Sequence, residues 1–236
     1  MCEGGNKTLA VKETSEITPS ELFEKVLDSA CEAIAEAHPI GYGETKSELL
    51  ARIVKVLVKT GKHKSAVRMA VEIPELGWRI NALKEIAKDF AKAGNIKSAR
   101  RIVDKIRNAD PLSKAGDKAW EEIAKDLIKA GNIELTRRAI DEVKDINLQA
   151  ELRIEIAKAS HKPEDIALAK RTVNEINNAY RRAKLWLEIA KTTHENEDLI
   201  SAVHAVAKIE NPELRANALV EIAEILAAMM TKKEPR

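Results

Sequence analysis

Residues 119–143 read AWEEIAKDLIKAGNIELTRRAIDEV, and this stretch indicates the fold. Apolar residues recur at intervals of three and four before Gly131, and the same pattern resumes after it as far as Val143. Such spacing predicts amphipathic helices, and a glycine between them supplies the left-handed residue that ends a helix. The stretch therefore predicts two antiparallel helices joined by a short turn.

The centre of this unit, Ile123-Ala124, has counterparts along most of the chain. An isoleucine followed by a small apolar residue occurs six times, in steps of 33, 37, 33, 33 and 33 residues. A period of this size is typical of solenoids, in which stacked units share one continuous core. We call the isoleucine of each pair the anchor isoleucine. The other pairs are Ile53-Val54, Ile86-Ala87, Ile156-Ala157, Ile189-Ala190 and Ile222-Ala223.

Other positions keep their character when the units are aligned on the anchor isoleucine. Thirteen residues after it, four units have alanine and one has threonine, which predicts a close crossing of two helices. Eight residues after it, the first three units have glycine, but the next two have glutamate, so we expect differently shaped turns there. The glycines are Gly61, Gly94 and Gly131, and the glutamates are Glu164 and Glu197.

These patterns predict an all-α protein, a right-handed α-solenoid of about five antiparallel helical hairpins with an N-terminal helix and a C-terminal capping helix. Thr18-Pro19-Ser20-Glu21 has the residues of a helix start. We expect this N-terminal helix to end near His38-Pro39. The predicted segments are a flexible tail at 1–17, a helix and loop at 18–44, the repeats at 45–230 and a tail at 231–236.

The third unit resembles the tetratricopeptide repeat, a helix–turn–helix unit of similar length. The residues that carry the resemblance are Trp120, Ile123, Ala124, Leu127, Gly131, Ile133 and Thr136, together with Trp186 in the fifth unit and Pro111 after the second. The resemblance covers about residues 45 to 230 and implies a superhelix whose first helices line a concave groove that holds a peptide or helix of a partner protein. Other helical solenoids, such as HEAT repeats, are an alternative.

Composition excludes several classes of protein. The formal net charge of +2 is too small to indicate a nucleic-acid-binding protein from bulk electrostatics. No apolar run approaches the length of a membrane span, and the N-terminus has no apolar signal-peptide segment. We therefore expect a cytoplasmic protein without membrane association. Abundant lysine, glutamate and isoleucine with a single glutamine favour a thermophilic source.

Lysines recur at two positions of the predicted first helices, two and six residues after the anchor isoleucine. In the geometry that the resemblance implies, both positions face the groove, where neighbouring units are about 10 Å apart. A row of ammonium groups there attracts carboxylates or phosphates. We call these lysines the lysine ladder. Its members are Lys55, Lys88, Lys125, Lys158 and Lys191 at the first position and Lys59, Lys92, Lys129 and Lys162 at the second.

The ladder predicts a non-catalytic scaffold that binds an acidic extended segment of another protein. Lys88, Lys125 and Lys158 are its expected main charges, and Lys92, Lys129 and Lys162 its expected support. Lys55 and Lys191 extend the predicted site, with Ile154 and Leu187 for apolar contact. In an alternative interpretation, the glutamates three residues before four of these lysines neutralise their charges. Each such pair stabilises a helix by about 0.2–0.5 kcal/mol. These glutamates are Glu85, Glu122, Glu155 and Glu188.

Two further functions stay open. The predicted second helices carry a basic column that suits RNA or another polyanion, although acidic residues four positions later favour a salt-bridged surface. A structural subunit of a homo-oligomeric assembly is the other alternative, with Met229 and Met230 forming an adaptable apolar patch. The basic column consists of Arg68, Arg101, Arg138 and Arg171, joined by Arg100, Arg137 and Lys170.

No sequence pattern indicates catalysis, a cofactor or a metal. His161 and His194 are one repeat apart, but a metal site needs further ligands, so we predict ordinary turn residues. The chain has no Gly-rich phosphate loop, HExxH or GxSxG motif. We therefore expect that the protein is not an enzyme and binds no cofactor.

Overall fold

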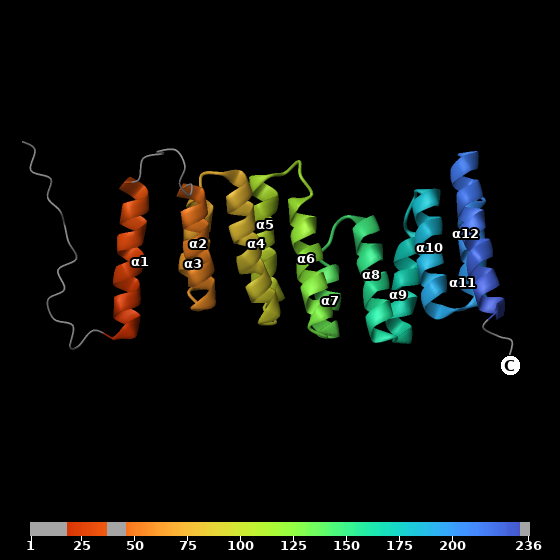
Figure 1. Ribbon diagram of the computed structural model, residues 1–236, viewed down its shortest axis with the longest axis horizontal. Coiled ribbons are helices and arrows are strands. Elements are labelled where there is room, and N and C mark those ends of the chain that lie inside the picture. Colours follow the sequence, from red (N-terminus) through yellow and green to blue (C-terminus); the bar gives the residue numbers. More distant parts are fainter. Residues whose placement is uncertain (1–17, 37–45, 232–236) are drawn as a thin grey trace, which may run out of the picture. The chain divides into compact units, whose positions relative to one another are not determined.

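The computed structural model describes residues 18–36 and 46–231. Within these ranges the chain forms twelve α-helices and no strand (Figure 1). The helices are α1 (Pro19–Glu36), α2 (Lys46–Lys59), α3 (His63–Glu72), α4 (Leu76–Lys92), α5 (Ile96–Ala109), α6 (Ala115–Lys129), α7 (Ile133–Ile140), α8 (Ile146–Ser160), α9 (Pro163–Asn174), α10 (Ala179–Thr193), α11 (Asn196–Val206) and α12 (Pro212–Thr231). The prediction of an all-α solenoid of helical hairpins is confirmed.

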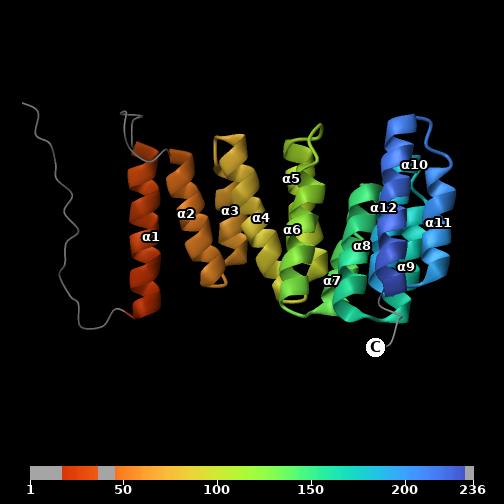
Figure 2. The same ribbon diagram turned by 45° about the vertical axis from the view of Figure 1, so that its right-hand side comes forward.

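The chain divides into two compact units, residues 1–82 and 83–236, with the division inside α4. In the first unit α2 packs against both α1 and α3, and Figure 2 shows α2 and α3 as adjacent helices joined at one end. Val54 and Leu57 of α2 are fully buried, as is Ala66 of α3. Small and aliphatic side chains thus form the core of this hairpin.

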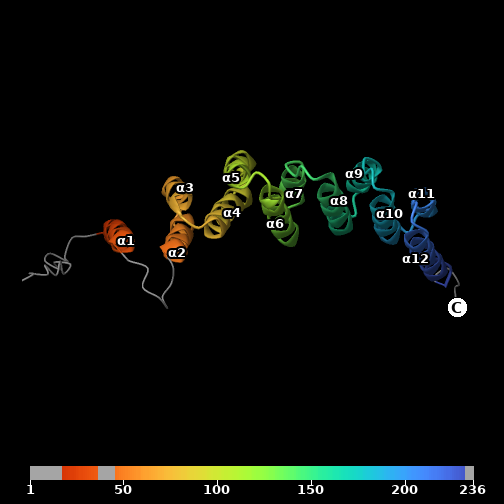
Figure 3. The ribbon, with the colours of Figure 1, turned by 90° about the horizontal axis from the view of Figure 1, so that it is seen from above.

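In the second unit the helices form two rows. Figure 3 shows α6, α8, α10 and α12 on one side and α5, α7, α9 and α11 on the other. The pairs α6–α7, α8–α9 and α10–α11 pack closely, as expected for antiparallel hairpins. We call α4, α6, α8, α10 and α12 the first helices and α5, α7, α9 and α11 the second helices.

The repeated residues of the sequence lie in the core of the second unit. The anchor isoleucines Ile123, Ile156 and Ile189 are at most 3% exposed, and Ala169 and Ala202 at the helix crossings are fully buried. An alanine at a crossing lets two helix backbones approach, while isoleucine and leucine fill the space between units. The 33-residue period therefore reports the positions that stacking buries.

The hairpin turns are of two kinds, as the sequence predicts. Gly94 and Gly131 end α4 and α6 with φ of 79° and 70°, in the left-handed region. In the next two hairpins His161 and His194 take this conformation instead, with φ of 53° and 57°. α8 therefore ends at Ser160, and Pro163 opens α9 at a position that suits proline.

The last helix packs on the core with one face and leaves a second apolar face exposed. Ala218 and Ile222 of α12 are buried in the hydrophobic core with Trp186 and Leu187. Leu219, Val220 and Leu226 are 46%, 57% and 41% exposed. The expectation that α12 caps the repeats is met by its buried face, because it packs against α10 and α11.

Some sequence predictions concern parts outside the described residues. These are the two predicted tails, the end of the N-terminal helix near His38-Pro39 and the loop that follows it. The side chains of Met229 and Met230 also lie outside this description. The predicted segment boundaries at 17, 44 and 230 therefore stay predictions.

Candidate protein-binding surface

The lysine ladder separates into two sets in the second unit. The inner row, two residues after the anchor isoleucines, is formed by Lys88, Lys125, Lys158 and Lys191. Lys88 Nζ lies 2.8 Å from Glu122, and Lys158 Nζ lies 2.8 Å from Glu188. Lys125 pairs with Glu121 at 2.7 Å, and Lys191 pairs with Glu188 at 2.9 Å. Every lysine of the inner row thus has a carboxylate partner.

These pairs differ from those that the sequence predicts. In the described part of the chain, Lys191 is the one inner-row lysine that pairs with the glutamate three residues before it. Glu122 of α6 instead accepts from Lys84 and Lys88 of α4, each at 2.8 Å. Glu188 likewise joins α10 to Lys158 of α8. The glutamates therefore connect neighbouring hairpins, which a pattern read along one helix does not reveal.

The environment keeps these glutamates ionised. Partial burial raises the pKa of Glu122, but hydrogen bonds from Lys84 and Lys88 outweigh it, and its pKa lies below the ordinary value. The same balance, with Lys158 and Lys191 as donors, lowers the pKa of Glu188. Since both glutamates are partly exposed, each pair contributes at most about 1 kcal/mol to stability.

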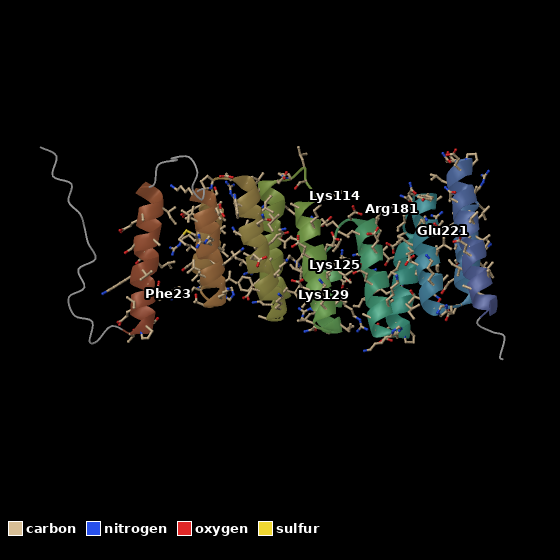
Figure 4. All side chains as sticks on the ribbon, viewed as in Figure 1. Phe23, Lys114, Lys125, Lys129, Arg181 and Glu221 are labelled. Atoms are coloured by element: carbon tan, nitrogen blue, oxygen red, sulfur yellow. The ribbon has the colours of Figure 1, made fainter. Side chains whose placement is uncertain are left out.

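The second set, which we call the end row, lies at the hairpin ends of the second unit and consists of Lys92, Lys129 and Lys162. Lys92 and Lys129 are the last residues of α4 and α6. Figure 4 shows Lys129 below Lys125, nearer the end of α6. The prediction that Lys162 lies on a first helix is wrong, because α8 ends at Ser160 and Lys162 is the residue before α9.

The end row is less neutralised than the inner row. All three of its lysines are exposed. Lys92 Nζ is 3.5 Å from Asp126, a loose ion pair on a side chain that is 59% exposed. Within the described ranges, Lys129 and Lys162 form no ion pair. The ammonium group of Lys129 is therefore available to a partner, and that of Lys162 is held by no ion pair, although its charge helps to lower the pKa of Asp165.

Lys55 of the predicted site belongs to the first unit. Its side chain is exposed on α2, and among the described residues it forms no ion pair. It thus offers a free charge on its own unit.

The two apolar residues of the predicted site are core residues. Ile154 is 3% exposed and Leu187 is 1% exposed, and both belong to the hydrophobic core of the last hairpins. The prediction that they offer apolar contact to a partner is therefore wrong. Their position two residues before the anchor isoleucine faces the neighbouring helices, where aliphatic side chains are stable.

Two buried carboxylates escaped the sequence analysis. Asp165 and Asp198 are each 2% exposed and lie one repeat apart. Asp165 accepts from Arg137 Nε at 2.7 Å and Ser160 Oγ at 2.6 Å. Asp198 pairs with Lys170 at 2.7 Å and accepts from Thr193 Oγ1 at 2.6 Å. The missed signal was a serine or threonine five residues before aspartate in the two units without a turn glycine.

The second helices carry an exposed basic column in the second unit. We call Arg101, Arg138 and Arg171 the arginine column; all three are exposed, and none forms an ion pair with a described residue. The expected pair of Arg138 with Glu142 is absent from the described contacts, because Glu142 pairs with Arg100 of the preceding hairpin. Arg137 and Lys170, by contrast, are bound to the buried aspartates.

The described residues contain no group of three histidine, cysteine, aspartate or glutamate side chains that could hold a metal ion. No helix in the described ranges is both long and apolar enough to cross a membrane. The histidines of the two later turns act as left-handed helix caps, with backbone N–H groups bonded to Ala157 and Ala190.

Comparison with known proteins gives similarity to helical repeats. No family model matches the sequence, and no curated protein matches it either. Among solved structures, a tetratricopeptide repeat protein from Parabacteroides merdae ATCC 43184 is 16% identical over 86% of this chain and 79% of its own, with a TM-score of 0.31. A de novo designed helical repeat protein is 19% identical over 92% and 88% of the two chains, with a TM-score of 0.19. The helical-hairpin architecture is assigned from this chain's own helices and their packing.

Proposed function

We propose that this protein is a non-catalytic scaffold that binds an acidic, extended segment of another protein along the first helices of its second unit. Helical repeats create extended surfaces that commonly serve protein binding. The observation that supports an acidic partner is the end row, because Lys129 and Lys162 have no ion pair in the described structure. Three exposed ammonium groups at successive hairpins match carboxylates spaced along an extended peptide.

The end row is a better binding site than the inner row for an energetic reason. A partner carboxylate that binds Lys88 or Lys158 must displace Glu122 or Glu188, which already bond them at 2.8 Å. Lys129 needs no such exchange. The inner-row lysines still add long-range attraction, because Lys125, Lys158 and Lys191 are 44%, 44% and 46% exposed. Attraction of this kind increases the rate of association more than the affinity.

The arginine column favours a second candidate function, the binding of RNA or another polyanion on the second helices. Arg101, Arg138 and Arg171 repeat at one position of successive hairpins, as phosphates repeat along a nucleic-acid strand. Binding of this kind depends steeply on salt and little on sequence. The two candidates therefore place the partner at different sites, the hairpin ends in the first case and the exposed side of the second helices in the other.

Two charge-reversal variants test the candidates against each other. The lysine variant changes Lys92, Lys129 and Lys162 to Glu. The arginine variant changes Arg101, Arg138 and Arg171 to Glu. Both change the net charge equally and alter exposed side chains, so each is the control for the other. Fluorescence anisotropy measures binding of a labelled glutamate-rich peptide and a labelled single-stranded RNA, after circular dichroism has shown that both variants are folded.

The scaffold proposal expects the wild type to bind the acidic peptide and the lysine variant to lose at least about tenfold in affinity. The arginine variant should retain the peptide. An equal loss of peptide affinity in both variants would show a nonspecific response to net charge and would contradict peptide binding at the end row. RNA binding that is abolished by the arginine variant, with no peptide binding, would instead favour the second candidate.

A further inference from the structure

A cleft of about 340 Å³ lies in the second unit between α9, α10 and α11, away from the end row. A volume of this size is at the lower end of the range for small-molecule sites. Its lining contains no carboxylate side chain. The residues that matter for its chemistry are Asn174, Arg182, Trp186, Ser201, His204 and Lys208.

Among the described residues, the cationic groups of the cleft have no acidic partner. Arg182 is held in place because its Nη1 donates to the Ile176 carbonyl oxygen at 2.8 Å, which leaves its other N–H groups free. Within the described ranges, neither Arg182, His204 nor Lys208 forms an ion pair. Ser201 already donates its hydroxyl to the Glu197 carbonyl oxygen at 3.0 Å, so it can only accept. Trp186, 5% exposed, forms an apolar wall.

The preceding repeat has a charge-neutral set of side chains at the positions that correspond to this cleft. Thirty-three residues earlier, Arg153 occupies the position of Trp186 and Asp141 that of Asn174. Arg153 Nη2 donates to Asp141 at 3.1 Å, and its Nη1 donates to the Thr172 hydroxyl. The earlier junction is thus filled by a guanidinium that has its own carboxylate.

The cleft is more positively charged than the corresponding junction of the preceding repeat. Asn174 replaces an aspartate, and Lys208 stands where the earlier repeat has Glu175. The earlier set has two positive side chains, Arg153 and Arg171, and two negative ones. The cleft has the positive Arg182 and Lys208, a histidine and no negative side chain. Two positive side chains therefore line the cleft, whereas the corresponding set of side chains in the preceding repeat is neutral.

We infer that this cleft binds the phosphate group of a small molecule. Two positive charges balance a phosphate dianion, whereas a carboxylate supplies a single negative charge. An arginine fixed at one N–H and open at the others suits a phosphate oxygen pair. Asn174 and His204 offer further donors at the rim. The side of Trp186 then contacts the organic part of a phosphate ester.

The test uses inorganic phosphate and phenyl phosphate as probes, with acetate as the carboxylate comparison. Calorimetry at constant ionic strength and about pH 8, where phosphate esters are dianions, gives the affinities. Tryptophan fluorescence is a second readout, because Trp186, one of the chain's three tryptophans, lines the cleft. The variant Asn174→Asp/Lys208→Glu restores the carboxylates of the preceding repeat. Its control, Asn108→Asp/Lys97→Glu on α5, makes the same charge change at exposed positions outside the cleft.

The proposal expects saturable phosphate binding by the wild type and the control, and a loss of at least about tenfold in the cleft variant. Tighter binding of phenyl phosphate than of inorganic phosphate would identify an ester as the ligand, and equal binding would identify free phosphate. Unchanged binding by the cleft variant, acetate binding as tight as phosphate, or no saturable binding of either phosphate probe would overturn it. The proposal is independent of the end row, so the lysine variant should bind phosphate normally.

Discussion

Asp145 shows what one carboxylate contributes to this surface. It precedes α8 and accepts from the backbone N–H groups of Asn147 at 2.9 Å and Leu148 at 3.3 Å. It also accepts from Lys114 Nζ at 2.5 Å, across the junction of two hairpins. The hydrogen bond from Lys114 and those from the backbone outweigh partial burial and lower the pKa of Asp145 to about 2. The side chain therefore caps a helix and joins two repeats at once.

The lowered pKa of Asp145 predicts how the stability of the folded protein changes at acid pH. Because the folded-state pKa lies below the unfolded value, the stabilisation is complete above about pH 4 and is lost as pH falls toward about 2. We expect Asp145→Asn to lower the free energy of unfolding at pH 7 by about 1–2 kcal/mol, a value reduced for screening of the exposed Lys114. Urea denaturation at pH 7 and at pH 2.5 measures the difference. A loss that is equally large at both pH values would contradict a role for the charge.

Sequence reading found the charged positions but not their partners. The period places Lys88 and Glu122 at fixed distances from their anchor isoleucines, but it contains no information on which side chain each one meets in the next hairpin. The sequence therefore predicts that the inner row pairs within each helix, whereas Lys88 and Lys158 pair with glutamates of the next hairpin. The error at Ile154 and Leu187 has a related cause, because a helix inside a solenoid is covered on more than one face.

At the scale of the element, the later hairpin turns hold strain that the earlier ones lack. His161 and His194 have positive φ, a conformation that costs an L-residue about 1–2 kcal/mol relative to the right-handed region. Glycine takes this conformation at no steric cost and stands at the corresponding ends of α4 and α6. The loss of turn glycine in these units is visible in the sequence, but the residue that replaces it is not, because the left-handed residue comes three positions earlier relative to the anchor isoleucine.

We therefore expect His161→Gly and His194→Gly to raise the free energy of unfolding, each by about 0.5–1 kcal/mol. The matched control is Ala167→Gly at an exposed position inside α9, which should lower it by about 1 kcal/mol. Thermal denaturation followed by circular dichroism distinguishes the two signs. A decrease in the free energy of unfolding for both histidine variants would contradict the presence of backbone strain at these positions.

At the scale of the whole molecule, the hairpins of the second unit are joined by buried and partly buried ion pairs as well as by apolar packing. Asp165 connects α9 to Arg137 of α7, and Asp198 connects α11 to Lys170 of α9. Burial raises the pKa of Asp165, but hydrogen bonds from Arg137 and Ser160 outweigh it, and the pKa is lowered. In a solenoid each unit contacts its neighbours alone, so such a link acts locally.

This locality predicts the response to Asp165→Ala. Removing one partner of a buried ion pair costs about 3–5 kcal/mol when the other charge stays buried, and less here because Arg137 is 26% exposed. We expect faster amide hydrogen exchange in α7, α8 and α9, with little change in α2 and α3 of the first unit. Glu164→Ala, at a neighbouring side chain that is 64% exposed, is the control. A uniform increase along the chain would show that the repeats unfold as one cooperative body instead.

The repeat period predicted the helical hairpins and their core, because stacking imposes the same burial on the same position of each unit. It did not indicate the division of the chain inside α4, because the anchor isoleucine Ile86 and its neighbours follow the same pattern as in other units. Nor did it separate the end row from the inner row. Both are lysines at helical spacing, and they differ in contacts that form between hairpins.

The most direct test of the scaffold proposal is to map where an acidic peptide binds. Hydrogen exchange measured by mass spectrometry on the wild-type chain, with and without the glutamate-rich peptide, gives this map in solution. The proposal predicts protection at the hairpin ends around Lys92, Lys129 and Lys162, with the second helices unchanged around Arg101, Arg138 and Arg171. Protection confined to the second helices around the arginine column, or none at saturating peptide, would contradict it.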